Sequence, residues 1–231
     1  MLDWGMAIDD RRERERAARR RLIITTAREL AEAEGWEAVT TRRLSTEIEY
    51  SQPVLYKHFA GMGQLVDAVA IDGFGELVDV IRAARSCQGA AGTALTRIAH
   101  AYLDFARDHP AVCDAMFTRA TTLRFAAHDA PPELTAAFAE LRNAVGLVAD
   151  EQDADALTEV LWGALHGLVT LRSTGRLRPG HDSERAQLLV DQLTPKHNPT
   201  TTGAGVERAP RRRPGSESTT WGQGPPRKPV L

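Results

Sequence analysis

Two short amphipathic segments joined by a tight turn, residues 41–48 and 52–59, constrain the fold of this chain most. Thr40 precedes the first segment and is a good N-cap, because its hydroxyl can accept a hydrogen bond from an amide of the first turn. Leu44 and Ile48 are four residues apart and share one face of a helix. The pattern predicts a helix over 41–48 with a narrow apolar side.

The second segment repeats this design. Ser51 is a candidate N-cap, and Pro53 stands in the first turn, where its missing N–H leaves no helical hydrogen bond unmade. At about 100° per residue, Leu55 and Phe59 point into the core. The outward positions then carry Pro53, Val54 and Lys57, and the flanks carry Gln52, Tyr56 and His58.

A longer helix is predicted upstream, over residues 9–34. Ile23, Ala27 and Leu30 recur at helical spacing, and Gly35 offers a conformation that ends a helix. Three helices in this order, with small, polar and basic groups on the outer face of the third, are typical of a helix-turn-helix that enters the major groove of DNA. Residues 9–62 are therefore predicted to form a DNA-binding domain.

Charge is unevenly distributed along the chain. The 231 residues have a net charge of −2, but residues 11–28 contain eight arginines against Glu13 and Glu15. Residues 71–194 carry 11 basic and 17 acidic side chains, and residues 195–231 carry seven and two. Phosphate contacts need local rather than total positive charge. Residues 11–21 are thus either a DNA contact or a solvated helix face.

The remainder of the chain reads as helices, so the predicted fold class is all-α. A connecting helix at 63–84 contains Gly73 and Gly75, each of which weakens it by about 1 kcal/mol relative to Ala. The expected domain at 85–194 contains helices at 93–109 (capped by Thr93), 110–124, 133–149, 150–174 and 182–193. Residues 195–231 are rich in Pro and Gly without apolar periodicity, which predicts a disordered tail.

Two motifs give the chain a family resemblance. Thr40-Thr-Arg-Arg-Leu44 followed by Ser51-Gln-Pro-Val-Leu-Tyr-Lys-His-Phe59 resembles the DNA-binding region of the TetR family of transcriptional repressors. Trp162-Gly-Ala-Leu-His-Gly167 resembles an element of some C-terminal domains of this family. The resemblance implies that the DNA-binding domain at 9–62, here called the reader, is followed by a helical ligand-binding and dimerisation domain. It also implies a double-stranded DNA operator and a small-molecule effector as partners, with no cofactor or metal.

The resemblance also assigns roles to residues of the reader. Thr40 and Thr41 would meet the phosphate backbone, and Arg42 could reach a guanine through its bidentate guanidinium. Gln52 could pair with adenine, and Pro53 and Val54 could pack on thymine methyl groups. Tyr56, Lys57 and His58 would meet phosphates or groove edges. Packing roles remain open for Tyr56, as a brace for the first helix, and for His58.

Two positions depart from the family pattern. Glu49 stands where the family usually has Gly in the turn, with Tyr50 in place of a small apolar residue. A non-glycine residue with positive φ costs roughly 1 kcal/mol or more, and its carboxylate repels phosphate. Met62 replaces a common lysine after the third helix. We expect weakened, not abolished, DNA binding.

The predicted domain at 85–194, here called the sensor half, has weaker sequence signals for its interface and binding site. Leu157, Leu161 and Leu168 belong to more apolar positions than one core needs, so the helices at 155–174 and 182–193 are predicted to form a homodimer; burial within one chain is the alternative. Aromatic and polar residues in mid-helix could line an effector pocket, although for any one of them a structural role is favoured over ligand contact. They are His100, Tyr102, Phe105, Met116, Phe117, Trp162 and His166.

Other classes of protein are disfavoured. We find no HExxH, GxSxG or phosphate-cradling glycine loop, so an enzyme is not expected. Cys87 and Cys113 lack the spacing of a zinc or redox site, and no apolar run approaches the roughly 18 residues that span a bilayer. We expect a cytoplasmic bacterial regulator. The alternative is a helical small-molecule or protein binder that has lost specific DNA recognition.

Overall fold

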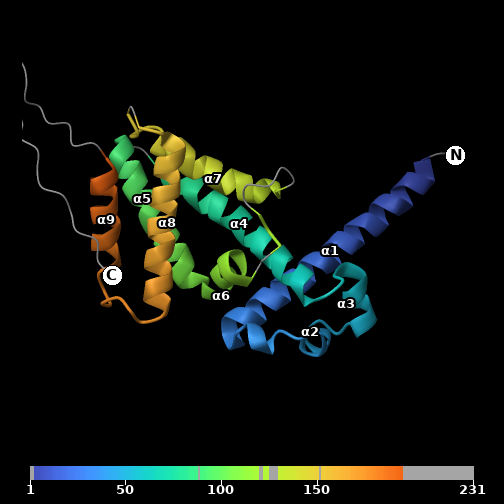
Figure 1. The fold of residues 1–231 in the computed structure, drawn as a ribbon. Helices are drawn as coiled ribbons and strands as arrows, with labels where there is room; N and C mark the ends of the chain where they lie inside the picture. The colour runs from blue at the N-terminus through green and yellow to red at the C-terminus, as the bar shows by residue number, and fades with distance from the viewer. Residues whose placement is uncertain (1–2, 88, 120–121, 125–129, 151, 195–231) are drawn as a thin grey trace, which may run out of the picture. The chain divides into compact units, whose positions relative to one another are not determined.

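The computed structural model describes residues 3–194 except 88, 120–121, 125–129 and 151. These residues fold into helices with no β-strand among them, which confirms the predicted all-α class (Figure 1). All of them belong to one compact unit. Within this described part, none of the helices is long and apolar enough to cross a membrane. The predicted disordered tail lies outside the described residues, and the predicted domain boundaries stay predictions.

The N-terminal helices pack around a shared apolar core. They are α1 (Asp3–Glu34), the 3-10 turn η1 (Trp36–Ala38), α2 (Thr41–Glu47) and α3 (Gln52–His58). Ile23 of α1, Leu44 of α2 and Leu55 of α3 are all buried and line one small cavity together. The residues that the helical spacing predicted to point inward therefore do so.

The end of α1 follows the sequence signal. Gly35 takes a positive φ of 84°, and its amide donates to Ala31 O at 2.9 Å. The next residue, Trp36, is buried, and its indole N–H donates to Ala111 O at 2.9 Å, which gives the polar edge of the ring an acceptor. This contact ties the end of α1 to α6 (Pro110–Asp114).

The turn between α2 and α3 contains Glu49, one of the two positions that depart from the pattern of the resembled family. Thr40 caps α2 as predicted, with its hydroxyl accepting from Arg43 N at 3.1 Å. Glu49 adopts a φ of 55°, and the Tyr50 amide donates to Ser45 O at 3.1 Å. This is a Schellman turn, in which the left-handed position favours glycine. Glu49 therefore occupies a strained site. Ser51 begins α3 without a side-chain cap hydrogen bond, contrary to expectation.

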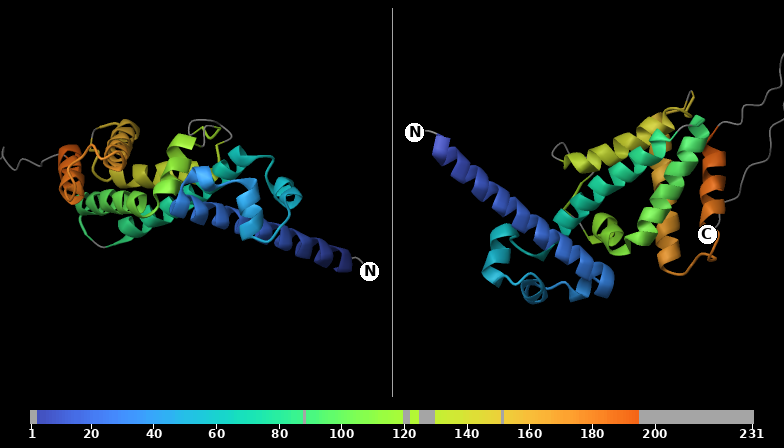
Figure 2. Two further views of the ribbon diagram at one scale, coloured as in Figure 1. Left: turned by 90° about the horizontal axis from the view of Figure 1, so that it is seen from below. Right: turned by 180° about the vertical axis from the view of Figure 1, so that it is seen from behind.

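The long helix α4 (Met62–Ser86) connects the reader to the remaining helices. It packs against α5 (Ala91–Asp108), α6, the π-helical turn η2 (Ala115–Arg119) and α7 (Pro132–Val145), and these neighbours surround it in both views of Figure 2. Its glycines were expected only to weaken it. A Cβ on Gly73, however, would lie 2.9 Å from Sδ of Met116 and closer still to Cγ1 of Val112. Gly73 thus permits close packing of α4 on α6 and η2.

Several predicted helices of the sensor half have different bounds, and the one predicted at 133–149 ends at Val145. Thr93 does not cap its helix, since α5 begins at Ala91 after Ala90. The helix predicted from Pro110 to Arg124 is wrong, because α6 ends at Asp114 and η2 at Arg119. The wider π-turn follows where Val112 and Met116 press on Gly73, and tertiary packing of this kind has no periodic signal in sequence.

Of the last two helices, α9 (Asp182–Leu193) has its predicted range, whereas α8 (Ala154–Ser173) begins four residues later than predicted. Asp153 caps α8, accepting from the amides of Asp155 and Ala156. Leu161 and Leu165 are buried, whereas Val160 is 56% exposed and Leu188 is 62% exposed. These two helices therefore carry apolar side chains that the chain itself does not cover.

Candidate nucleic-acid interface

The outer face of α3 is formed by exposed side chains. Gln52, Pro53 and Lys57 are exposed, while Leu55 and Phe59 are buried on the opposite side. The side chains of Gln52 and Lys57 form no hydrogen bond or ion pair within the described residues. Val54 is half-buried, so less of it faces outward than predicted. Helix α3 presents hydrogen-bonding groups that are free for an external partner.

The two adjacent arginines of α2, Arg42 and Arg43, differ in their contacts. Arg43 is held by Glu34 at 3.0 Å and by Glu47 at 3.0 Å. Arg42 is exposed, and its guanidinium has no ion pair with any described residue. Thr40 is exposed and Thr41 is half-buried at the start of the helix. Of the two arginines, only Arg42 keeps its donors available for a bidentate contact.

The end of α3 is braced by α1 through an arginine that sequence reasoning did not single out. Arg20 donates to His58 O at 3.2 Å, and its guanidinium lies over the Phe59 ring at 4.3 Å. A cation at a helix C-terminus also complements the helix dipole. Burial, followed by the nearby charges of Arg16, Arg20 and Arg19, lowers the pKa of His58. The end of α3 thus lies in a positive field.

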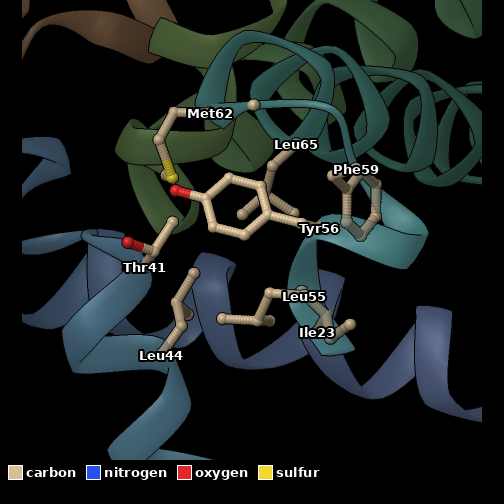
Figure 3. Close-up of a pocket in the computed structure, with 9 residues that line it drawn as sticks. Ile23, Thr41, Leu44, Leu55, Tyr56, Phe59, Met62 and Leu65 are labelled. Carbon is tan, nitrogen blue, oxygen red and sulfur yellow. The ribbon is translucent and has the colours of Figure 1, made fainter. Parts of the chain in front are cut away.

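Tyr56 lines one small apolar cavity together with Ile23 of α1 and Met62 of α4. Figure 3 shows the tyrosine ring among the other residues that line this cavity. The cavity has a volume of about 10 Å³, no more than one water molecule needs. Tyr56 remains 54% exposed. It therefore braces the start of α4 while its outer edge stays accessible.

Four of the sensor candidates come together between α5, η2 and α8. The Phe117 ring is 4.6 Å from the ring of His166 and 6.0 Å from that of Trp162. The Trp162 indole N–H donates to the Tyr102 hydroxyl oxygen at 3.3 Å. Burial raises the pKa of Tyr102 and lowers that of His166. These residues form a contiguous aromatic cluster.

The other three candidates lie apart from one another. Met116 is buried against Gly73, and Phe105 packs edge-on against His109 with ring centroids 5.1 Å apart. His100 contacts Ser183 of α9, with Nε2 3.2 Å from the hydroxyl oxygen. Each of these three residues has a packing or bridging role that the sequence spacing could not distinguish from ligand contact.

His166 also faces a groove of about 310 Å³ on the other side of the cluster. The groove includes Cys113, Thr118 and Arg172, none of which was predicted as a site residue. Nδ1 of His166 is buried without a hydrogen-bond partner in the described part of the chain. Because a buried polar atom is ordinarily paired, this atom is a candidate contact for a bound molecule. Only tertiary packing brings these helices together, so sequence spacing gave no signal for the groove.

The geometry of α2 and α3 defines a helix-turn-helix protein, and comparisons with known proteins specify the class further. Residues 23–69 match the family model of bacterial regulatory proteins of the tetR family, and residues 95–193 match the tetracyclin repressor-like C-terminal domain. The chain therefore belongs to the TetR family, a family of DNA-binding transcriptional regulators.

Individual relatives agree with this assignment. The chain is 30% identical over 95 residues to the uncharacterized HTH-type transcriptional regulator YobS of Bacillus subtilis, a match that covers 41% of this chain and about half (49%) of that protein. It is 29% identical over 163 residues to the uncharacterized HTH-type transcriptional regulator Rv0681 of Mycobacterium tuberculosis, covering 68% and 71%. The fold resembles the TetR family transcriptional regulator PfmR from Thermus thermophilus, with a TM-score of 0.54, 17% identity and coverage of 74% and 96%.

Proposed function

We propose that this protein is a dimeric repressor that reads its operator with α3 and leaves it when a small molecule binds between α5, η2 and α8. The observation that carries this proposal is the free outer face of α2 and α3, where Arg42 and Gln52 have no partner in the described chain. A protein that acts on the chromosome in this way works in the bacterial cytoplasm.

The roles within the reader follow from the chemistry of each side chain. Arg42 is suited to guanine O6 and N7, and Gln52 to adenine N6 and N7, while Pro53 and Val54 suit thymine methyl groups. Thr40, Thr41, Tyr56, Lys57 and His58 would contact phosphates, which set register without reading sequence. Arg43 is excluded because Glu34 and Glu47 already neutralise it.

Dimerisation through α8 and α9 would place two readers about 34–36 Å apart on successive major-groove turns. Val160 and Leu188 supply exposed apolar area. Gly163 and Gly167 add support, since a Cβ at either would meet nothing within 4 Å. Glycine weakens a helix, and no residue in the described part of the chain uses the space, so close approach of a partner helix gives these glycines a purpose. Analytical ultracentrifugation tests this, with Leu188→Asp expected to give monomers.

The route from sensor to reader would run through α4. The Phe117 ring contacts His166 on one side and the ring of Phe74 in α4 on the other, at 5.4 Å between ring centroids. Met116 lies against Gly73, the residue of α4 that directly precedes Phe74. A ligand that displaces Phe117 would therefore shift α4 and change the separation of the two readers. Operator affinity would fall through a coupling free energy between the sites.

The decisive test selects bound duplexes from a random pool with the purified full chain, then compares the selected duplex with a scrambled one. We expect Arg42→Ala and Gln52→Ala each to reduce the preference by about 1–3 kcal/mol, the range for a bidentate base contact. Arg43→Ala is the matched control and should keep the preference. If no sequence is enriched, the helical-binder alternative replaces the repressor.

A further inference from the structure

Helix α1 extends well beyond the core of the reader. Its 32 residues begin at Asp3, whereas Ile23 is the first buried residue among the side chains described from Asp9 onward. Every side chain from Asp9 to Leu22 is exposed. Figures 1 and 2 show the dark-blue part of α1, before the helix reaches α3, without another helix against it. The extension therefore contributes no core packing, and its composition must be explained by solvent or by an external partner.

The arginines of the extension fall on two different faces. Residues three or four apart share a face, and Arg12, Arg16 and Arg19 continue the row that Ile23 and Ala27 occupy further along α1. Arg20 lies beside this row. The row thus changes from apolar to basic where the helix leaves the core. We call Arg12, Arg16, Arg19 and Arg20 the basic row.

The remaining arginines of the extension serve as an internal comparison. At about 100° per residue, Arg14 and Arg21 lie on the opposite side of α1, and Arg11 lies on the flank of the row. Arg11 pairs with Glu15 at 3.0 Å, and Arg14 Nε donates to Asp10 O at 3.2 Å. These contacts within one helix are those of a solvated face.

The basic row adjoins the end of the recognition helix. Arg20 reaches His58 O, and the charges of Arg16 and Arg19 also act on the His58 ring. Arg16 has no ion pair with a described residue. The pairs of Arg12 with Asp9 and Arg19 with Glu15 are long, at 3.8 and 3.7 Å. Besides Asp9 and Glu15, Glu13 is the acidic residue near the basic row. The row therefore keeps a net positive charge next to α3.

We infer that the basic row is a second DNA-binding element, which binds phosphates of the duplex outside the base pairs read by α3. This inference rests on the proposed function. From Ile23 to Arg12 the helix rises about 16 Å, which matches roughly five base-pair steps of B-form DNA. Phosphate is the partner that fits, because the row offers guanidinium groups without an aromatic or apolar surface to bind a protein.

The test compares two variants with the same change in charge on the same helix. Arg12→Gln with Arg16→Gln alters the basic row, and Arg14→Gln with Arg21→Gln alters the opposite face. Each lost phosphate contact makes the plot of log K against log salt less steep by about 0.9. The first variant should therefore lose about 1.8 per subunit, or about 3.6 for a bound dimer, and the second nearly nothing. Hydroxyl-radical footprinting on the selected duplex should show that only the first loses protection beyond the α3 half-site.

The outcomes separate this inference from the proposed function. If wild type and the Arg12/Arg16 variant have equal slopes and footprints, the basic row is not a second DNA-binding element. The proposed repressor function would stand in that case, because the sequence preference persists. Equal losses in both variants would also overturn the second element, since general charge would then suffice. If wild type itself shows no sequence preference, the repressor proposal fails instead. Circular dichroism of each variant checks that α1 remains helical.

Discussion

The carboxylate of Glu32 in α1 accepts a hydrogen bond of 3.0 Å from the backbone N–H of Val112 in the first turn of α6. A second bond of 3.0 Å comes from the Ala111 amide. Nearby, Arg28 of α1 donates to both carboxylate oxygens of Glu76 in α4 and lies 3.3 Å from Nδ1 of His109. The reader is therefore joined to the sensor half by α1 as well as by α4.

Replacing Glu32 by Gln should weaken this joint. The neutral amide can accept one of the two hydrogen bonds but loses the charge that favours a helix start, so we expect a loss of about 1–2 kcal/mol in unfolding free energy. Urea denaturation measures it. Glu29→Gln, on an exposed position of the same helix, is the control and should leave stability within about 0.5 kcal/mol.

Glu49→Gly should stabilise the protein by about 1 kcal/mol. Glu49 holds a φ of 55°, which glycine adopts without the steric cost. Removing its carboxylate should also raise DNA affinity at low salt. Glu49→Ala separates the effects, because it removes the charge and keeps the strained backbone. A glycine variant no more stable than the alanine variant would contradict the strain argument.

Met62→Lys should steepen the salt dependence of operator binding by about 0.9 in slope per subunit, or about 1.8 for a bound dimer, through one added phosphate contact in each reader. Met62 is half-buried beside Tyr56, and the aliphatic part of lysine can keep this packing while its ammonium group reaches solvent. Met62→Leu is the control, with unchanged slope. An unchanged slope for the lysine variant would refute the placement of residue 62 near the phosphate backbone of the DNA.

Gly73→Ala should destabilise the protein, although alanine is the better helix former. The added methyl would overlap Val112 and Met116, and overpacking of this kind costs about 1–3 kcal/mol. Gly63, in the same helix, has nothing within 4 Å of the position that an added methyl would take, so Gly63→Ala should be neutral or stabilising by up to about 1 kcal/mol. Thermal unfolding of the pair measures the difference.

The half-buried ring of His166 should make the protein less stable as the pH falls. Burial lowers its pKa, so below about 6.5 the unfolded chain binds a proton that the folded chain resists. The unfolding free energy therefore falls as the pH drops through about 6.5, and the loss ends below the folded-state pKa. His58 acts in the same direction. His166→Gln should flatten the profile between pH 7.5 and 5.5 relative to wild type.

The reader was largely predictable because its signals are local. Helix caps, a proline in the first turn and apolar residues four apart act within one helix, so Thr40, Leu44 and Leu55 lie as the sequence predicted. The non-glycine turn at Glu49 was visible for the same reason. The bounds of α9 followed from equally local patterns.

The sensor half depended on contacts between distant segments. Sequence alone determined that the protein is helical, that it begins with a helix-turn-helix and which side chains of α3 face outward. Tertiary structure decided that Gly73 is a packing contact, that α6 gives way to a π-turn, and that Phe117 and His166 meet. Periodicity reports which side of a helix is buried, but not which helix covers it, because burial free energy is non-directional.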